Sequence, residues 1–181
     1  MFQPLPAAPA MHAPDDTMST MKIDIIRADY RDPRQARDLV YLLNAYAEDP
    51  MGGGRALPAS VRDKLAAALA ELPHAFSLLC YVDGAPAGLA NCLEGFSTFR
   101  CRKLVNIHDI AVLPAFRGMG LARRLLEQVE AVARERGCCK LTLEVLEGNA
   151  GAQAAYRKFG FASYELDPAL GRAMFWEKPL D

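Results

Sequence analysis

The sequence lacks several features that would assign it to a class of protein at once. No stretch approaches the roughly 18 consecutive apolar residues that cross a bilayer, and the first residues lack the basic start and continuous apolar core of a signal peptide. Neither sign of charge prevails, since 21 Lys and Arg stand against 22 Asp and Glu. A net charge of −1 leaves no overall field to gather nucleic acid or an anionic membrane. We therefore expect a cytoplasmic protein that binds neither.

The cysteines and histidines give no sign of a disulfide scaffold or a metal site. There are five cysteines, an odd number that includes the adjacent pair Cys138 and Cys139, which fits reduced thiols better than a secreted disulfide framework. No CxxC occurs, and the three histidines lie far apart along the chain. The sequence therefore predicts no metal centre.

The composition divides the chain into a short tail and one domain. Residues 1–21 are rich in Pro, Ala and Met, with four prolines in the first 14 residues. Proline opposes both helix and sheet, so we expect a disordered tail here. The remaining residues, 22–181, suit a single domain with one hydrophobic core.

Hydrophobic periodicity predicts an α+β domain. Apolar runs and alternating patterns predict seven strands, at 22–28, 75–82, 86–92, 103–113, 139–146, 161–164 and 173–177. Apolar residues at helical spacing predict four helices, at 33–48, 60–72, 120–136 and 149–159. Successive hairpins and one strand-helix-strand unit indicate a mixed, mostly antiparallel twisted sheet with one parallel pair.

The segment with the clearest chemistry is the loop Arg117-Gly118-Met119-Gly120-Leu121-Ala122, between the fourth predicted strand and the third predicted helix. The first amides of a helix have no internal partners and carry the positive end of the helix dipole. Gly118 and Gly120 have no Cβ to hold a ligand away from the backbone. An anionic pyrophosphate is the expected occupant, and Arg117 with the pair Arg123-Arg124 would add positive charge beside it.

Two other interpretations of the loop stay open on these residues alone. Gly118-x-Gly120-x-x-Arg123 partly matches a dinucleotide-binding fingerprint, with the acidic Glu144 lying 24 residues further on. However, arginine replaces the third glycine, and the loop follows four predicted strands instead of the first. The glycines could also do no more than let a helix pack closely.

Two motifs together resemble the GNAT superfamily of N-acetyltransferases. The loop matches the family pattern (Gln/Arg)-x-x-Gly-x-(Gly/Ala) from Arg117 to Ala122. A second pattern, Asn-x-x-Ala-x-x-x-Tyr-x-x-x-Gly-Phe, is matched downstream by Asn149, Ala152, Tyr156, Gly160 and Phe161. The resemblance covers residues 22 to 181 and is weakest in the first 80. It implies a sheet splayed between its fourth and fifth strands, and transfer of an acetyl group from acetyl-CoA to a primary amine by direct attack in a ternary complex.

The resemblance also implies which residues hold the donor. The pantothenate arm would lie between the splayed strands and pair like an extra strand with Ile110, Ala111 and Val112. Asn149 would contact the pantetheine arm, and Tyr156 would reach the thioester sulfur. The pyrophosphate would rest on the backbone amides of Gly118, Met119, Gly120, Leu121, Ala122 and Arg123.

Acetyl transfer to an amine benefits from an acid for the leaving thiolate and a donor for the carbonyl oxygen. Tyr156 is the predicted acid, because a phenol with a pKa of about 10 is well matched to a thiol with a pKa of about 8.5. A backbone amide near Ala111 or Val112 is the predicted donor to the oxygen.

The residue that removes the proton from the amine has two candidates. Relatives that acetylate protein N-termini have a glutamate base at the place of Glu144. Relatives that acetylate small polyamines have a glutamate at the place of His108, where an imidazole with a pKa of about 6.5 could substitute. Asp109 has the opposite strand parity to His108, so we expect it to play a supporting role.

The acceptor is the least determined part of the prediction. Glu94, Phe96 and Phe99 follow the third predicted strand and could hold a cationic, partly apolar amine by charge pairing and ring stacking. Tyr46 on the first predicted helix is a further candidate. A small molecule is the expected acceptor, and the family also implies a homodimer. A non-catalytic acyl-CoA-binding module is the alternative, since it would keep the glycine loop but not need Tyr156.

Overall fold

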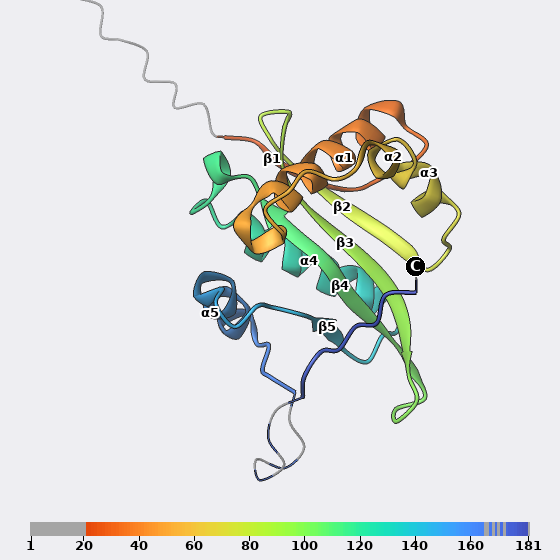
Figure 1. Ribbon diagram of the computed structural model, residues 1–181, viewed down its shortest axis with the longest axis vertical. Helices are drawn as coiled ribbons and strands as arrows, with labels where there is room; N and C mark the ends of the chain where they lie inside the picture. Colours follow the sequence, from red (N-terminus) through yellow and green to blue (C-terminus); the bar gives the residue numbers. More distant parts are fainter. Residues whose placement is uncertain (1–20, 165–166, 168, 170, 172, 181) are drawn as a thin grey trace, which may run out of the picture.

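The structure is a computed structural model that describes residues 21–164, 167, 169, 171 and 173–180. The tail predicted for residues 1–21 lies outside these residues, apart from Met21. The described chain forms one sheet with helices on both of its faces (Figure 1).

Each strand of the sheet lies beside its neighbours in the sequence, in the order β1-β2-β3-β4-β5. The strands are β1 (Ile23–Arg27), β2 (Ala75–Val82), β3 (Ala85–Ser97), β4 (Arg102–Val112) and β5 (Leu141–Leu143). The pairs from β1 to β4 are antiparallel, and β4 pairs with β5 in parallel. The predicted α+β fold with a mostly antiparallel sheet and one parallel pair is confirmed.

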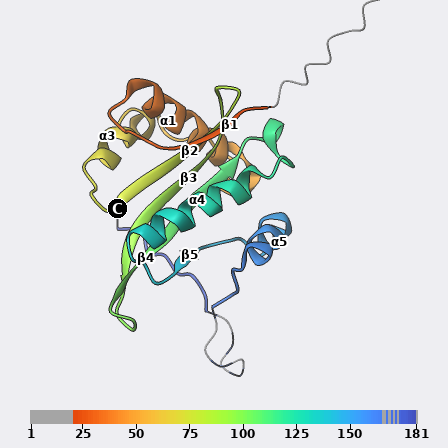
Figure 2. The ribbon, with the colours of Figure 1, turned by 180° about the vertical axis from the view of Figure 1, so that it is seen from behind.

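Helices cover both faces of the sheet. They are α1 (Pro33–Glu48), α2 (Ala59–Arg62), α3 (Leu65–Ala70), α4 (Leu121–Glu135) and α5 (Ala150–Phe159). Figures 1 and 2 show α1, α2 and α3 on one face and α4 on the other. Helix α1 begins where the sequence predicts, because Asp32 accepts hydrogen bonds from the amides of Arg34 and Gln35 at 2.8 and 2.9 Å.

Two apolar clusters join these layers. The larger cluster packs α4, through residues such as Leu125 and Val129, against one face of the sheet. The smaller cluster packs Leu39 and Leu42 of α1 against the opposite face. Strand β2 contributes to both clusters, and every one of its residues is buried. A strand buried on both faces has no side that faces solvent, which is why every residue of β2 except Ser77 is apolar.

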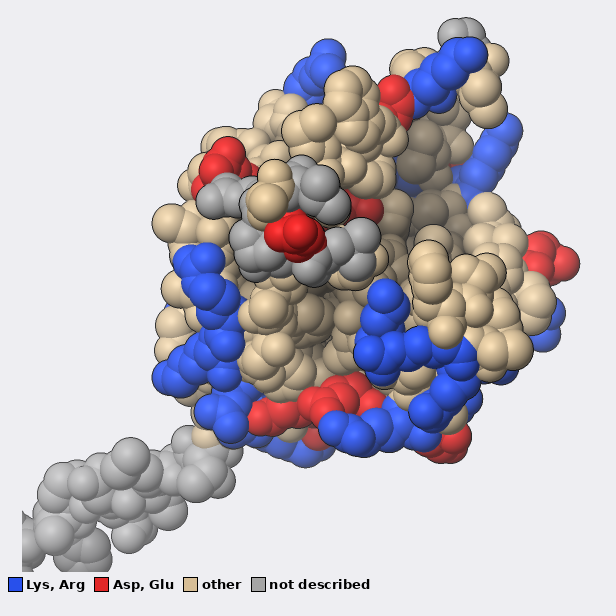
Figure 3. Space-filling view, turned by 90° about the horizontal axis from the view of Figure 1, so that it is seen from below, with Lys and Arg blue, Asp and Glu red and all other residues tan. Residues whose placement is uncertain are grey.

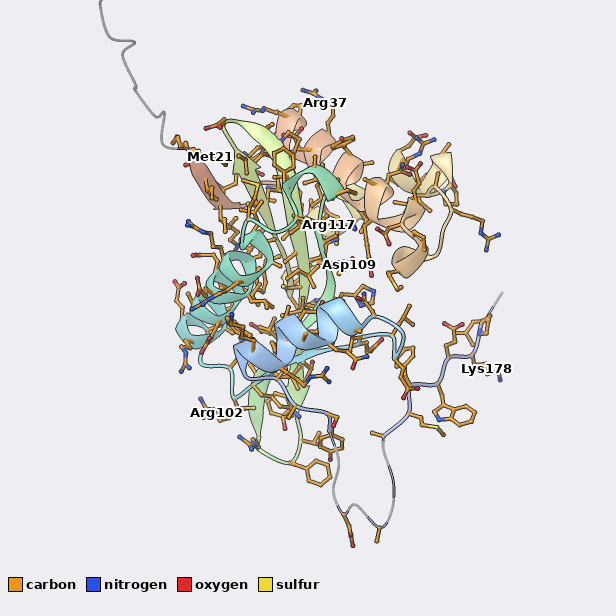
Figure 4. The ribbon with its side chains drawn as sticks, turned by 90° about the vertical axis from the view of Figure 1, so that its left-hand side faces the viewer. Met21, Arg37, Arg102, Asp109, Arg117 and Lys178 are labelled. Carbon is orange, nitrogen blue, oxygen red and sulfur yellow. The ribbon has the colours of Figure 1, made fainter. Side chains whose placement is uncertain are left out.

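The prediction of seven strands is wrong. Phe161–Tyr164 and Ala173–Glu177 fall within the described residues but form no strand there. Phe175 and Trp176 are 71% and 79% exposed, and Figure 4 shows Lys178 apart from the sheet. An alternating pattern is a local signal, whereas a strand also needs a partner edge with free hydrogen-bonding groups.

The prediction of four helices is also wrong, because the helix expected at 60–72 is divided into α2 and α3. The helix is interrupted at Asp63 and Lys64, which form a turn. This break turns Leu65 and Leu69 toward the cluster beneath α1, while the residues of α2 stay exposed. Packing against α1 therefore decides the direction of α3, and the periodicity of the segment does not show it.

Candidate functional site

The loop between β4 and α4 contains two glycines in the left-handed region. After a short 3₁₀ turn at Pro114–Phe116, φ is +80° at Gly118 and +76° at Gly120, values that glycine adopts without steric cost. A Cβ at either position would meet no other atom within 4 Å. The glycines therefore serve the path of the backbone, and the interpretation that they let α4 pack closely is wrong.

The amides from Gly118 to Arg123 donate to no acceptor among the residues that the structure describes. The first helical hydrogen bond of α4 runs from the Arg124 amide to the Gly120 carbonyl at 3.2 Å, so the donors before it point out of the helix start. Leu121 and Leu125 are buried beneath this end of the helix and hold it against the sheet. The loop thus presents fixed donors at the positive end of a helix dipole, which fits an anion such as pyrophosphate.

Two of the three arginine side chains near the loop, Arg117 and Arg123, form ion pairs within the protein. Arg117 Nη2 lies 2.7 Å from Asp49 Oδ2, and Arg117 Nε donates to the Val112 carbonyl at 3.2 Å (Figure 4). The hydrogen bond from Arg117 holds the pKa of the Asp49 carboxyl below its usual range. Arg123 pairs with Glu127 at 2.8 Å. Arg117 therefore links the end of α1 to the end of β4. Arg124 has no ion pair among the described residues, so its charge and the backbone amides of the loop remain for an anion.

Strands β4 and β5 separate at the level of this loop. Their parallel pairing ends at Ile107 and Leu143, while β4 continues to Val112 with its other edge still paired to β3. The edge of β4 that faces away from β3 is open from His108 onward among the described residues, and Figure 1 shows α5 below it. This is the splay between the fourth and fifth strands that the family resemblance implies, and Ile110, Ala111 and Val112 lie on it.

Helix α5 presents Tyr156 near this opening. Asn149 begins the helix by accepting from the Ala152 amide at 3.1 Å, and Gly160 ends it in the left-handed region. Burial raises the pKa of Tyr156 to about 12, and the nearby Tyr46 phenol adds to the rise. Tyr156 therefore keeps its proton at neutral pH, but a pKa of about 12 lies further from that of a thiol, about 8.5, than the value of about 10 on which the prediction relied.

A β-bulge at His108 changes which way the side chains of β4 point. Asn91 pairs with Asp109 while Cys92 pairs with Ile107, so His108 is an extra residue in the strand. Ile107 and Ile110 both pack against the α4 cluster although they are three residues apart. His108 and Asp109, between them, both line a cavity on the α1 face. The prediction that these two residues have opposite parity is wrong, because strict alternation fails at a bulge.

Three neighbouring strands contribute a row of hydrogen-bonded side chains to the α1 face. Ser77, Asn91 and Asp109 are direct cross-strand partners on β2, β3 and β4. Ser77 Oγ donates to Asn91 Oδ1 at 2.6 Å, and Asn91 Nδ2 donates to Asp109 Oδ2 at 2.9 Å. Because this uses the Ser77 proton, Tyr30 donates its own hydroxyl proton to Ser77 Oγ at 2.9 Å. The row therefore ends on a carboxylate that only accepts.

A cavity of about 320 Å³ lies over this row. Its volume falls at the lower end of the roughly 300–1,000 Å³ of small-molecule sites. Apolar side chains from α1, α3, the strands and the loop after α1 form most of its wall: Leu43, Ala47, Leu57, Leu65, Leu69, Phe76, Cys92 and Leu93. Its polar lining consists of Tyr30, Tyr46, Ser77, Asn91, His108 and Asp109. The cavity therefore combines an apolar wall with a hydrogen-bonded floor.

Tyr46 lies where the cavity approaches the opening between β4 and β5. Burial raises the pKa of Tyr46, and the carboxylates of Asp109 and Asp49 raise it further. Its phenol also acts on the pKa of Tyr156, so Tyr46 lies within electrostatic reach of both Asp109 and Tyr156. Figure 4 shows Asp109 between α1 and α5. The structure therefore brings together four of the predicted or supporting residues: Tyr46, His108, Asp109 and Tyr156.

Other predicted site residues lie elsewhere. Glu94 pairs with Lys103 at 2.8 Å and with Arg136 at 3.5 Å. Phe96 and Phe99 are 58% and 99% exposed toward the tip of the β3–β4 hairpin. Neither they nor Glu94 are among the described residues that line the cavity, because the long hairpin carries them past it.

Two further differences from the sequence prediction concern Glu144 and the polar residues of the row. Glu144 follows the short β5 and is exposed, outside the cavity. The row residues Tyr30, Ser77 and Asn91 were not among the predicted site residues. Ser77 and Asn91 stand out only as polar residues inside apolar strands, and both are buried, at 1% and 8% exposure. A buried polar residue needs a hydrogen-bond partner, so this pattern could have indicated a network.

Charged side chains of both signs lie on the face of the molecule seen from below. Lys and Arg side chains border a hollow of largely uncharged surface there, and Asp and Glu side chains lie at its edge (Figure 3). Within the described residues no helix is long and apolar enough to cross a membrane, and no group of three or more His, Cys, Asp or Glu side chains could hold a metal ion.

Known proteins with similar sequences and folds are acetyltransferases. Streptothricin acetyltransferase of Streptomyces lavendulae is 44% identical over 88 residues, which are 49% of this chain and 44% of that protein. The structure of ribosomal-protein-alanine N-acetyltransferase from Brucella melitensis superposes with a TM-score of 0.67 at 23% identity, covering 81% of this chain and 96% of that one. An aminoglycoside N-acetyltransferase in complex with CoA gives a TM-score of 0.69 at 19% identity, covering 88% and 96%. At these identities the structures show the fold alone.

The extent of these similarities differs. The chain spans half or less of the length of the curated relatives it matches. By contrast, the model of the acetyltransferase (GNAT) family matches residues 26–161, which include the end of β1, all of β2 to β5, the glycine loop and all of α5. This match extends over most of the chain and includes both motifs. The chain therefore belongs to the acetyltransferase (GNAT) family.

Proposed function

We propose that this protein transfers the acetyl group of acetyl-CoA to the primary amine of a small molecule by direct attack. The observation that carries the proposal is the run of unpaired amides from Gly118 to Arg123, which directly follows the open edge of β4. A separate cavity reaches the same strand from its α1 face. One strand thus borders both a site for an anionic carrier and a site for an acceptor.

The donor side fits coenzyme A in its charge and in its shape. The amides of the loop would hold the pyrophosphate, and the open edge from Ile110 to Val112 would pair with the amide groups of the pantetheine arm. Asn149 uses its Oδ1 to begin α5, which leaves its Nδ2 to donate to that arm. Acetyl-CoA supplies an acetyl group activated as a thioester.

The acceptor side supplies charge and a base. Asp109 would bind the incoming ammonium through Oδ1, since Oδ2 is held by Asn91. His108 lies beside it at the bulge and would take the proton that the ammonium must lose before it attacks. Both roles rest on the position of these side chains in the cavity. Glu144, outside the cavity, is the alternative base.

Groups on the donor side would act on the leaving group and on the carbonyl oxygen. Tyr156 would give its proton to the thiolate sulfur as the carbon–sulfur bond breaks, and its raised pKa keeps that proton in place beforehand. A backbone amide near Ala111 or Val112 would donate to the carbonyl oxygen as negative charge develops on it.

Relatives support the choice of acceptor. The streptothricin and aminoglycoside acetyltransferases are named for small molecules, and the aminoglycoside enzyme is seen with CoA. The Brucella enzyme is named for a protein. The size of the cavity, about 320 Å³, favours a small molecule for this chain.

The decisive experiment measures free thiol released from acetyl-CoA by the purified chain with a broad panel of amines, and identifies the acetylated amine by mass spectrometry. We expect release that depends on the amine, with one acetylated amine formed for each thiol. Binding of CoA without release by any amine would favour the non-catalytic module instead. Stronger thermal stabilisation of the protein by NAD(P) than by CoA would favour the dinucleotide interpretation of the loop.

The base is identified by two matched variants. His108→Gln should lower kcat and remove the acid limb of its pH profile, because a neutral amide cannot take the proton. Glu144→Gln should leave both unchanged. The opposite result would move the base to Glu144.

A further inference from the structure

We infer that the acceptor carries a single amine on an apolar body about as long as a seven-carbon chain, and that polycationic acceptors are disfavoured. This inference rests on the proposed function and deepens it. It comes from the charges on the cavity wall, from the hydrogen bonds of its floor and from the direction in which the cavity runs.

The cavity offers one place for a positive charge. Among the described residues that line it, Asp109 is the one acidic side chain, and no Lys or Arg occurs. Glu48 and Asp49 lie near the end of α1 but are bonded to Asn44 and Arg117. A ligand with several ammonium groups would therefore find a carboxylate for one of them only.

The polar floor does not offer a second binding site for a cation. Each member of the row from Tyr30 to Asp109 is already bonded to its neighbour. Asn91 Oδ1 accepts from Ser77, and the Ser77 hydroxyl accepts from Tyr30, so these oxygens are engaged within the row. The row therefore orients the Asp109 carboxylate and leaves its Oδ1 as the group that meets the ammonium.

The opposite wall is apolar. Leu57 comes from the loop after α1, and Leu65 and Leu69 come from α3. A second ammonium placed against these side chains would lose its water without gaining a partner, which is strongly unfavourable. Methylene groups in the same place would be stabilised by leaving water.

The direction of the cavity sets the length of the acceptor. Asp109 lies on β4, Asn91 on β3 and Ser77 on β2, so the lining crosses two interstrand spacings, or about 10 Å. A straight chain of about seven carbons spans a similar distance at ordinary bond lengths. With its ammonium at Asp109, such a chain would reach Leu65 and Leu69.

The test compares amines that differ in one charge. Heptylamine and 1,7-diaminoheptane have the same length, and the second ammonium of the diamine would fall against the leucines. We expect kcat/KM for heptylamine to be higher by at least about tenfold, as for other single-group discriminations in pockets. From propylamine to heptylamine, kcat/KM should rise roughly fourfold per methylene, the ratio that corresponds to burial of one CH₂ group.

A pair of variants at Leu57 should change the preference between heptylamine and 1,7-diaminoheptane. Leu57 is half-buried in a loop, and its backbone amide donates to Asn44 at 2.9 Å, an interaction that a new side chain retains. Leu57→Asp should raise the ratio of kcat/KM for the diamine over that for heptylamine at least about tenfold, whereas the uncharged Leu57→Asn should not. Asp109→Asn should raise KM for heptylamine and leave CoA affinity unchanged.

The outcomes separate this inference from the proposed function. Turnover of 1,7-diaminoheptane or of an aminoglycoside equal to or better than that of heptylamine in the unaltered protein would overturn the inference and leave the acetyltransferase intact. Absence of thiol release with every amine would overturn the proposed function itself. A Leu57→Asp ratio no different from that of Leu57→Asn would show that the acceptor does not lie along this wall.

Discussion

The proposed donor site and the proposed acceptor cavity meet along β4 but are built from different parts of the protein. The proposed donor site consists of backbone amides from one continuous segment, Gly118 to Arg123. The floor of the acceptor cavity consists of side chains from the β1–α1 loop and three strands, spread from Tyr30 to Asp109 along the sequence. A site made of backbone needs only a particular chain path, whereas a site made of distant side chains depends on the register of several strands.

In the proposed reaction, this difference lets the acceptor cavity change while the donor site stays the same. Amides are present in every residue, so the anion site depends chiefly on glycines that permit φ values of +80° and +76°. A change of one wall residue such as Leu57 or Leu93 alters the acceptor cavity without touching the loop. The predictions below probe each side and the links between them.

The largest effect is expected at the glycine loop. Gly120→Asp places a carboxylate at the helix start, and repulsion of a phosphate at about 4 Å amounts to about 4 kcal/mol at an effective dielectric constant of 20. CoA affinity should fall by about 10³-fold, as measured by calorimetry. Gly120→Asn is the matched control, since Asn tolerates the left-handed region and has the same shape without the charge. Equal losses of CoA affinity in both variants would show that the loop does not select its ligand by charge.

Tyr156 lies on the donor side, and its proposed role is to protonate the thiolate at the place where the two sites meet. Tyr156→Phe should lower kcat by about 10²- to 10⁴-fold, the usual contribution of a general acid, and leave CoA affinity unchanged. Because the pKa of Tyr156 is raised to about 12, the phenol keeps its proton through pH 10. A fall in wild-type kcat between pH 8 and 10 should therefore arise from another group. Full activity of the phenylalanine variant would remove Tyr156 from the chemistry.

The polar row should show a smaller effect confined to the acceptor side. Ser77→Ala leaves Asn91 Oδ1 without its donor in a buried position, and the expected loss is about 1–3 kcal/mol of unfolding free energy. KM for the amine should rise while CoA affinity stays the same. Ser60→Ala on the exposed α2 is the control, with a change within about 0.5 kcal/mol. A weaker affinity for CoA in Ser77→Ala would contradict the separation of the two sites.

The smallest effect is expected at the ion pair between the two regions. Asp49→Asn removes the partner of Arg117, whose side chain is 56% exposed, so the loss at pH 7 should stay below about 1 kcal/mol. The folded pKa of Asp49 is lowered, so its contribution is present above the usual pKa of 3.8 and is lost as the pH falls below it. Urea unfolding of wild type and variant should therefore differ at pH 7, and the difference should shrink as the pH falls below 3.8. A difference that persists in acid would assign the effect to something other than the charge.

Much of the donor site could be predicted from the sequence because its determinants are local. Gly118 and Gly120 set the turn, and the match from Asn149 to Phe161 includes the residues that begin and end α5. Asn149 and Gly160 occupy positions that helix ends favour for reasons of backbone chemistry alone. A motif of this kind keeps its meaning without knowledge of the rest of the fold.

The predicted acceptor residues Glu94, Phe96 and Phe99 lie outside the proposed cavity because long-range pairing places them. Glu94, Phe96 and Phe99 follow a strand that the sequence suggests is short, yet β3 continues to Ser97 and carries them along the hairpin. The bulge at His108 has no glycine or proline to mark it, and it alone turns Asp109 into the cavity. Register and bulges come from the fit of one strand on another, which no single segment encodes.

The sequence by itself determined the mixed fold, the glycine loop and the helix that carries Tyr156, because each depends on hydrophobic periodicity or on residues that govern a few neighbouring φ and ψ angles. The tertiary structure decided the number of strands, the link from Arg117 to Asp49 and the alignment of Ser77, Asn91 and Asp109 across three strands. These features require residues far apart in the sequence to meet. Their partners are chosen by the packing of the whole sheet.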